Sequence, residues 1–112
     1  MNKKMKNSPK IFVCFVTCGK IVQAKKIANA LVNNKLAACV NIVKGVESIY
    51  RWKNKICRDR ENLLIIKGNF RNKSKLIAKI QSLHSYEVPE IIFLEIKSGS
   101  KKYLEWIDSV TK

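Results

Sequence analysis

Apolar and polar positions alternate with two different periods, and the first third of the chain shows both. Residues Ile11 to Cys18 read IFVCFVTC, which places apolar side chains on both faces of an extended strand. Residues 20–34 instead carry apolar side chains three and four positions apart and close on Asn33 and Asn34. This spacing predicts an amphipathic helix that follows a buried strand.

The middle of the chain predicts a long β-hairpin. Residues 38–52 form a β-rich run that only Gly45 interrupts, and we expect a bulge or bend there. A second β-rich run covers residues 56–68. The short polar segment between them predicts a hairpin tip near Asn54, because asparagine tolerates a positive φ.

The remaining residues predict three more elements, and together the elements indicate the fold class. Residues 72–84 predict a second helix, residues 89–97 a fourth strand and residues 100–110 a short terminal helix. Pro89 belongs among the first residues of its strand, since proline cannot donate to a ladder. The order βαββαβ predicts an α+β, ferredoxin-like antiparallel sheet with both long helices on one face.

The strands are more apolar than two helices can shield. Like Ile11–Cys18, the segments Leu63–Ile66 and Ile91–Leu94 are apolar on both faces. The short terminal helix cannot cover a whole sheet face, and soluble monomers rarely expose apolar patches larger than a few hundred Å². We therefore predict a homo-oligomer, in which other copies of the chain cover the second face.

Chain length and termini indicate a single domain. The 112 residues suffice for one core, with residues 1–10 expected as a disordered basic tail and residues 11–112 as the domain. The apolar stretch after the basic start is at the lower limit for a signal peptide and has no cleavage site, so we favour a strand and a cytoplasmic location. No apolar run reaches the roughly 20 residues of a membrane helix, and we expect no membrane partner.

The net charge of +15 raises the question of nucleic acid. Lysine supplies 19 of the 23 basic residues, whereas arginine is the residue that reads bases with two hydrogen bonds. The chain is also rich in asparagine and isoleucine, whose codons are AT-rich like those of lysine. We attribute much of the charge to this bias, and we expect weak, salt-sensitive attraction to polyanions without specific nucleic-acid binding.

The four cysteines show no C-x-x-C spacing. Cys14 and Cys18 fall about 13 Å apart on one strand face, too far for a disulfide. Cys18 precedes a helix start and lies two residues from Lys20, an environment that lowers a thiol pKa. We favour the alternative, a half-buried cysteine at the end of a strand.

Four segments together resemble one known family. In order they read KLAACVNIVKGVESIYRWKNKI, LLIIKG, HSYEVPEII and YLEWI, and they closely resemble the CutA divalent-cation tolerance family from Ile11 to Val110. The resemblance implies a tight homotrimer of ferredoxin-like subunits whose long hairpins reach their neighbours. It also implies a role in tolerance of copper and other divalent cations, with no established catalytic reaction.

The chain departs from that family's sequence in the hairpin and beside His84. A run that is commonly rich in glutamate reads ICRDRE here, which introduces Cys57, Arg58 and Arg60. The family's HPYEVP reads HSYEVP, so Ser85 replaces a proline beside His84. The loss of acids argues against a general cation-binding surface.

His84 and Cys39 are the candidate metal ligands, because imidazole and thiolate suit copper and zinc. The carboxylates of Glu87 and Glu90 would add oxygen ligands. In the structural alternative, His84 caps the second helix and Cys39 packs as a small apolar residue. We favour the structural interpretation, with weak copper binding rather than a selective site.

A second group of candidates suits a cleft or an interface between subunits. Aromatic walls, one acid and one cation fit a small molecule, whereas oligomer interfaces are also rich in aromatic residues. We favour the interface. The residues are Tyr50, Trp52, Lys67, Tyr86 and Trp106, with Glu90 as the acid.

The sequence thus predicts a non-catalytic cytoplasmic homotrimer for divalent-cation tolerance. We expect no obligatory cofactor, with copper or another divalent cation as the candidate ligand. The alternative is a small-molecule-binding signalling or scaffold trimer similar to the PII proteins, an analogy of fold alone. No catalytic triad spacing, phosphate loop or HExxH pattern is present.

Overall fold

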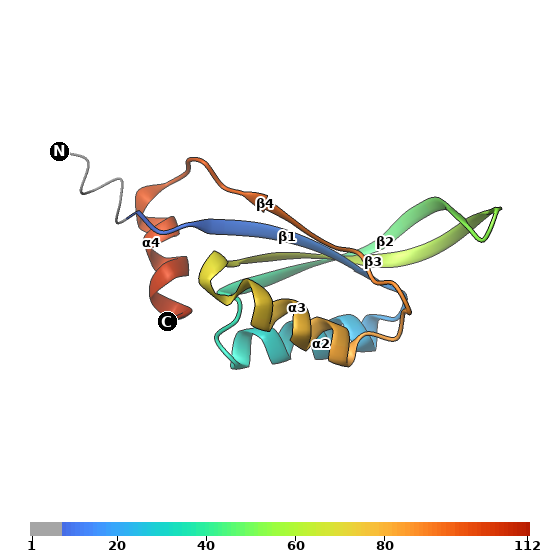
Figure 1. The fold of residues 1–112 in the computed structure, drawn as a ribbon, viewed down its shortest axis with the longest axis horizontal. Coiled ribbons are helices and arrows are strands. Elements are labelled where there is room, and N and C mark those ends of the chain that lie inside the picture. The colour runs from blue at the N-terminus through green and yellow to red at the C-terminus, as the bar shows by residue number, and fades with distance from the viewer. Residues whose placement is uncertain (1–7) are drawn as a thin grey trace.

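A computed structural model describes residues 8–112, so the predicted tail at residues 1–10 lies mostly outside the described residues. The elements follow the predicted order (Figure 1). They are β1 (Ile11–Cys18), α2 (Ile21–Asn33), β2 (Cys39–Trp52), β3 (Lys55–Asn69), the 3-10 turn η1 (Phe70–Asn72), α3 (Lys73–Leu83), β4 (Ile91–Glu95) and α4 (Lys101–Val110). The strands pair antiparallel in the order β2-β3-β1-β4, which confirms the ferredoxin-like α+β fold.

The core lies between the sheet and the two long helices, both of which cover the same face (Figure 1). Alternate side chains of β1, from Phe12 to Cys18, are fully buried there. Helices α2 and α3 meet them with residues at helical spacing, as predicted. The fully buried helix side chains are Ala24, Ile27, Leu31, Leu76 and Ile80.

The opposite face of the sheet has no comparable cover within the described chain. Phe15 of β1 lies between Ile65 and Ile92 on this face, and Leu94 is 54% exposed. Helix α4 packs only against the end of the sheet, where Ile107 is buried with Ile11 and Ala38. The structural basis of the predicted oligomer, an uncovered apolar face, is therefore present.

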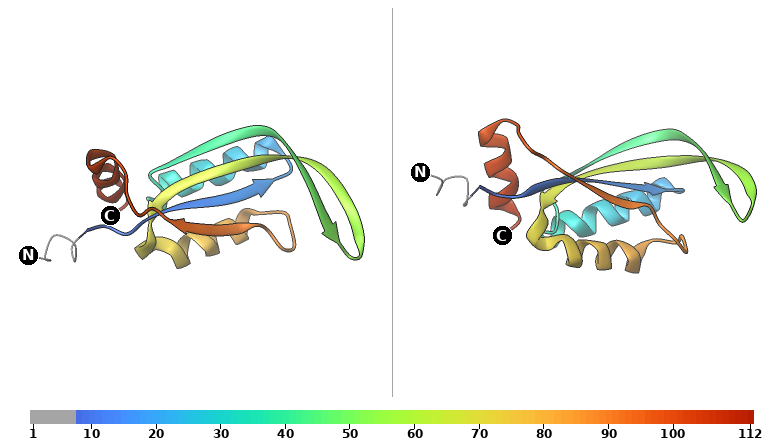
Figure 2. Two further views of the ribbon diagram at one scale, coloured as in Figure 1. Left: turned by 90° about the horizontal axis from the view of Figure 1, so that it is seen from above. Right: turned by 45° about the horizontal axis from the view of Figure 1, so that its top comes forward.

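Strands β2 and β3 extend beyond the body as a curved two-stranded ribbon, called here the arm (residues 46–61; Figure 2). Gly45 has φ 72° where the register shifts between Val43 and Val46, which confirms the predicted bulge. At the tip, Lys53 and Asn54 both have positive φ and form a two-residue turn, as predicted near Asn54. The arm gives the molecule extents of 54 × 26 × 22 Å.

Two boundaries differ from the sequence prediction. Strand β4 begins at Ile91, so Pro89 precedes the strand instead of opening it. The turn η1 was not predicted; it forms because the Asn69 side chain accepts a hydrogen bond from the Arg71 N–H at 2.8 Å. The described residues contain no helix that is long and apolar enough to cross a membrane.

The packing around Gly68 leaves no room for a side chain at this position. A Cβ at this position would lie 2.7 Å from Phe12 Cζ and 3.0 Å from the Leu36 carbonyl oxygen. Phe12 is fully buried and packs edge-on against Phe70, so its ring cannot move aside. We expect Gly68→Ala to lower the free energy of unfolding by about 1–3 kcal/mol, measured in urea at fixed protein concentration.

Gly99→Ala is the matched control, because a Cβ there meets Leu104 only at 3.6 Å, an ordinary contact. We expect a change within about 0.5 kcal/mol. Equal losses in the two variants would contradict the tight fit at Gly68.

Candidate functional site

A cleft of about 680 Å³ lies between the arm and the loop that joins α3 to β4. Its size is in the usual range for ligand sites, roughly 300–1,000 Å³. Acidic and aromatic side chains dominate its walls. They are Asp59, Glu61, Glu87 and Glu90, with Tyr50, Trp52 and Tyr86.

The strand register of the arm selects which side chains line the cleft. Alternate residues point to opposite faces of a strand, and directly paired residues point to the same face. Ser48 pairs with Asp59, and Tyr50 with Cys57, so these residues share one face of the ribbon. The predicted cleft residues Tyr50 and Trp52 therefore belong to the same surface as Asp59 and Glu61.

A hydrogen bond from Tyr86 to Glu61 connects the loop to the arm. The Tyr86 hydroxyl donates to the Glu61 carboxylate at 2.7 Å, and Glu61 is only 7% exposed. Burial and this hydrogen bond raise the pKa of the Tyr86 phenol well above its usual range. The bond gives a buried carboxylate its partner and fixes one wall of the cleft.

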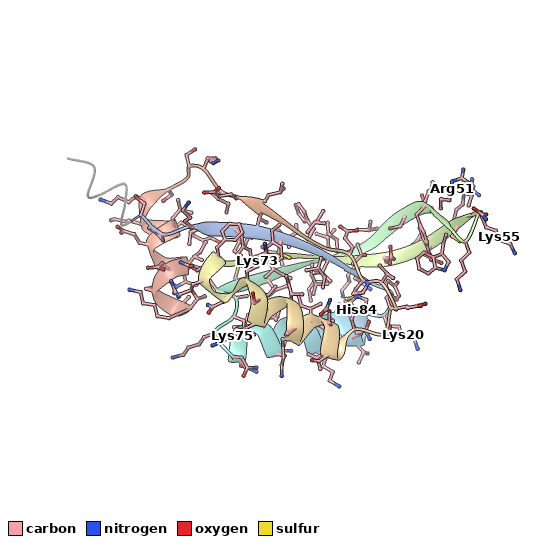
Figure 3. The ribbon with its side chains drawn as sticks, viewed as in Figure 1. Lys20, Arg51, Lys55, Lys73, Lys75 and His84 are labelled. Atoms are coloured by element: carbon pink, nitrogen blue, oxygen red, sulfur yellow. The ribbon has the colours of Figure 1, made fainter. Side chains whose placement is uncertain are left out.

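His84, which is labelled in Figure 3, is held within the chain by both of its ring nitrogens. The Tyr86 backbone N–H donates to Nδ1 at 3.1 Å, so Nε2 carries the proton and donates to the Thr17 carbonyl at 2.7 Å. His84 does end α3, and its backbone N–H bonds to Ile80, but its ring joins β1 instead of the last helix carbonyls. The imidazole thus positions the loop that carries Tyr86.

Cys18 is not an activated thiol. Its side chain is fully buried and lies 3.6 Å from His84 Nε2. Burial, with the nearby Glu61 charge, raises the pKa of the Cys18 thiol to about 11. The hypothesis of a lowered pKa is wrong, because burial raises the pKa of this thiol. The local sequence does not reveal how deeply Cys18 is buried, and the half-buried alternative also underestimated its burial.

Cys39 and His84 do not meet within one chain. Cys39 pairs with Lys67, which pairs with Val13, four residues along β1 from the Thr17 carbonyl that His84 binds. Four residues span about 13 Å of strand. The Cys39 sulfur instead lies 3.8 Å from the Tyr103 hydroxyl. Within residues 8–112, no three His, Cys, Asp or Glu side chains gather as a metal ion would need.

Two other predicted cleft residues lie elsewhere. The Lys67 ammonium bonds the Asn41 side chain on the neighbouring strand, and Trp106 packs beside Tyr103 on α4 at a ring distance of 5.6 Å. Neither residue lines the cleft. Their place in an interface between copies stays a prediction.

The cleft is strongly acidic in a basic protein. It collects four of the eight acidic residues of the chain and none of the 23 lysines and arginines. Burial and the charge of Glu61 raise the pKa of the Glu90 carboxyl. Asp59 accepts a hydrogen bond from Tyr50, which raises the pKa of that phenol to about 12. Such a site attracts cations and disfavours anions.

Sequence comparison finds one family. Residues 12–110 match the family described as CutA1 divalent ion tolerance protein. A relative named protein CutA, chloroplastic, from Arabidopsis thaliana is 46% identical over 112 residues, which is 100% of this chain and 61% of that protein. The chain thus spans less than two thirds of that relative. The divalent-cation tolerance protein CutA of Thermus thermophilus is 44% identical over 95 residues, 85% of this chain and 92% of that protein.

Structural comparison agrees. The crystal structure of CutA1 from Oryza sativa matches with a TM-score of 0.90 at 42% identity and covers 94% of this chain and 96% of that chain. The expected resemblance and the expected subunit fold are both confirmed.

Tyr86→Phe tests the bond between loop and arm. Removing the hydroxyl leaves the Glu61 carboxylate buried without this donor, so we expect a loss of about 1–3 kcal/mol in the free energy of unfolding. Tyr50→Phe is the matched control, since Tyr50 bonds Asp59 at an exposed position and should change stability little. Equal effects, measured by urea unfolding at fixed protein concentration, would count against the special role of the buried pair.

Proposed function

This chain belongs to the CutA1 divalent ion tolerance family, and we propose that it serves divalent-cation tolerance as a homotrimer that binds cations weakly in the acidic cleft. The charge of the cleft carries the proposal: a chain of net charge +15 lines one cleft with Asp59, Glu61, Glu87 and Glu90 and with no basic residue. The proposed task is binding, without a chemical reaction.

Glu87 and Glu90 are the members of the predicted ligand set that this cleft contains. Carboxylate oxygens bind most divalent ions, and Cu(II) binds a given oxygen or nitrogen site more tightly than its neighbours in the first transition series. Because no three ligating side chains gather within residues 8–112, the cleft suits weak binding, with copper preferred. His84 and Cys39 join such a site only where ligands from different subunits meet.

The proposed location is the cytoplasm. Compartment does not follow from the family, because the Arabidopsis relative is named chloroplastic. In support of the proposal, the apolar residues Ile11–Cys18 form β1, an inner strand of the sheet.

The homotrimer rests on the uncovered sheet face. Phe15, Ile92 and Leu94 form an apolar surface there, and sister subunits would remove it from water. The arm, which extends beyond its own subunit body, is suited to reach a neighbour. Obligate homo-oligomer interfaces are apolar in this way.

Sedimentation tests the assembly. We expect a species of three times the 12.9 kDa chain mass at micromolar concentration, and Leu94→Glu should dissociate it by placing a charge in the apolar contact. Val22→Glu is the matched control, because Val22 is 75% exposed on α2 and should leave the mass unchanged. A stable single subunit in the unmodified protein would exclude the proposed trimer.

Calorimetric titration with Cu(II) and Zn(II) tests the cleft. Replacing both Glu87 and Glu90 by Gln should weaken binding at least about tenfold, since two oxygen ligands lose their charge. The control, Glu95→Gln with Glu105→Gln, removes the same charge from exposed positions outside the cleft and should change affinity little.

Binding should also depend on pH. Because burial and the Glu61 charge raise the pKa of the Glu90 carboxyl, protons compete for it at a higher pH than for an ordinary glutamate. Affinity should be full above that raised pKa and fall as the pH drops through it.

In the titration of the variants, equal loss of affinity in both double variants would show that the cleft is not the binding site. A loss confined to His84→Ala would place the site at the imidazole.

The small-molecule alternative has one observation in its favour, the volume of about 680 Å³ with aromatic walls. The four acidic side chains restrict this alternative to cationic molecules. A thermal-shift screen in which cationic metabolites stabilise the protein at micromolar concentration would favour the signalling-trimer interpretation instead.

A further inference from the structure

The two long helices form a layer that carries positive charge and no negative charge. The layer comprises residues 20–35 and 70–83 and is called here the helix layer. None of the eight acidic residues of the chain falls in it, and composition bias towards lysine does not explain this absence of acids. Figure 3 labels Lys20 and Lys75 near opposite ends of the layer. Its basic residues are Lys20, Lys25, Lys26, Lys35, Arg71, Lys73, Lys75 and Lys79.

The lysines of the helix layer have no acidic partner in their own subunit. Arg71 forms an ion pair with Asp108 at 2.8 Å, whereas within residues 8–112 the seven lysines of the layer form none. Six of them are exposed, and Lys79 is half-buried. Their charge is therefore available to an external anion.

These lysines occupy positions that do not favour the helices. Lys73 and Lys75 lie in the first turn of α3, where a helix has a partial positive charge and acidic side chains are stabilising. Lys75 and Lys79 are four residues apart, so two like charges lie one turn apart on the same side of α3. Helix stability thus does not explain the arrangement, and a bound anion would reduce the repulsion.

An open hollow of about 460 Å³ lies between the end of α2 and α3. Lys75 and Lys79 line it together with Asn34 and Ser82, and among the described residues no acidic side chain lines it. Two ammonium groups, an amide and a hydroxyl can therefore donate hydrogen bonds to a group in the hollow. Such donors suit phosphate oxygens.

The helix layer remains accessible in the proposed trimer. Its helices cover one face of the sheet, whereas sister subunits would cover the opposite face, which carries Phe15 and Leu94 (Figure 1). Around a three-fold axis enclosed by those apolar faces, each helix layer points outward. The layer contains no residue of the arm, so its use does not require the arm to be free.

We propose that the helix layer binds inorganic polyphosphate, a linear chain of phosphate groups. Lysine binds phosphate as a point charge and needs no fixed geometry, which suits a flexible chain. A bare phosphate chain is narrow enough to place a phosphate group in the hollow lined by Lys75 and Lys79. The proposal goes beyond cation tolerance, because the acidic cleft is lined by other residues.

Nucleic acid and lipid fit the helix layer less well. Its one arginine, Arg71, is engaged by Asp108, and its sequence contains no tyrosine or tryptophan, so it lacks the side chains that best read and stack bases. The exposed large apolar side chains of the layer are Val22 and Val32, which ten residues of helix, about 15 Å, separate. Helices that bind a lipid surface present a continuous apolar face instead.

The test is fluorescence anisotropy of the full chain with fluorescein-labelled inorganic polyphosphate, between about 50 and 200 mM salt. Replacing Lys75 and Lys79 together by Gln should weaken binding at least about tenfold at the lower salt concentration. The slope of log affinity against log salt should become shallower by about 1.4 to 1.8, because each neutralised phosphate contributes about 0.7 to 0.9 in nucleic acids. The urea midpoint of this variant should not fall, since the two lysines repel each other.

The matched control replaces Lys101 and Lys102 by Gln, an equal loss of charge at exposed positions of α4. Its affinity should stay within about twofold of the unmodified protein, with sedimentation showing the same assembly in each variant. Lys75→Arg with Lys79→Arg keeps both charges and should also bind within about twofold. A tenfold loss in this arginine variant would contradict binding by charge.

Equal losses in the α3 and α4 glutamine variants would overturn the proposal, because net charge alone would then explain binding. Absence of binding by the unmodified protein would also overturn it. So would tighter binding to a DNA duplex at equal phosphate concentration, since nucleic acid would then be the partner. Binding to vesicles that contain phosphatidylserine, with no binding to polyphosphate, would assign the layer to a lipid surface and overturn the proposal as well.

Discussion

The sheet of this protein is apolar on two faces, and its own helices bury one of them. The buried face holds Phe12, Cys14 and Val16 of β1 against α2 and α3, which gives the subunit its core. The other face, with Phe15, Ile92 and Leu94, needs cover from outside the subunit. Assembly is therefore tied to the same strands that build the core, and substitutions on β1 would affect folding or association depending on which face they occupy.

The loop after α3 connects the sheet to the arm by side-chain hydrogen bonds. His84 bonds the end of β1 and holds the Tyr86 backbone, and the Tyr86 hydroxyl bonds Glu61 at the base of the arm. The single histidine of the chain is thus a structural part of the cleft wall. The arm in turn separates charge, with acidic and aromatic side chains on the cleft face and Arg51, Arg58 and Arg60 on the other.

Sequence reasoning succeeded where the signal was local. The period of the apolar residues located the helices and strands, and Gly45 and Asn54 marked the bulge and the tip. Distant pairings were missed. Asp59 and Glu61 reach the cleft only through the register and curvature of the arm. Lys67, predicted in the cleft with Tyr50 and Trp52, lies further along the sheet. The alternation from Tyr50, continued across the hairpin, places both acids on the face of Tyr50.

The bulge at Gly45 determines which alternate side chains of β2 face the cleft. Before it the odd-numbered residues, such as Val43, lie on the side of Leu63; beyond it the even-numbered residues, such as Tyr50, continue that side. One extra residue in the strand shifts the alternation of its side chains by one position. Deleting that residue while keeping the outer pairing to β3 intact would exchange inward and outward side chains along the inner half of β2. A single-codon deletion there would thus do more than shorten the ribbon, because the side chains of residues 39–43 would change faces of the sheet.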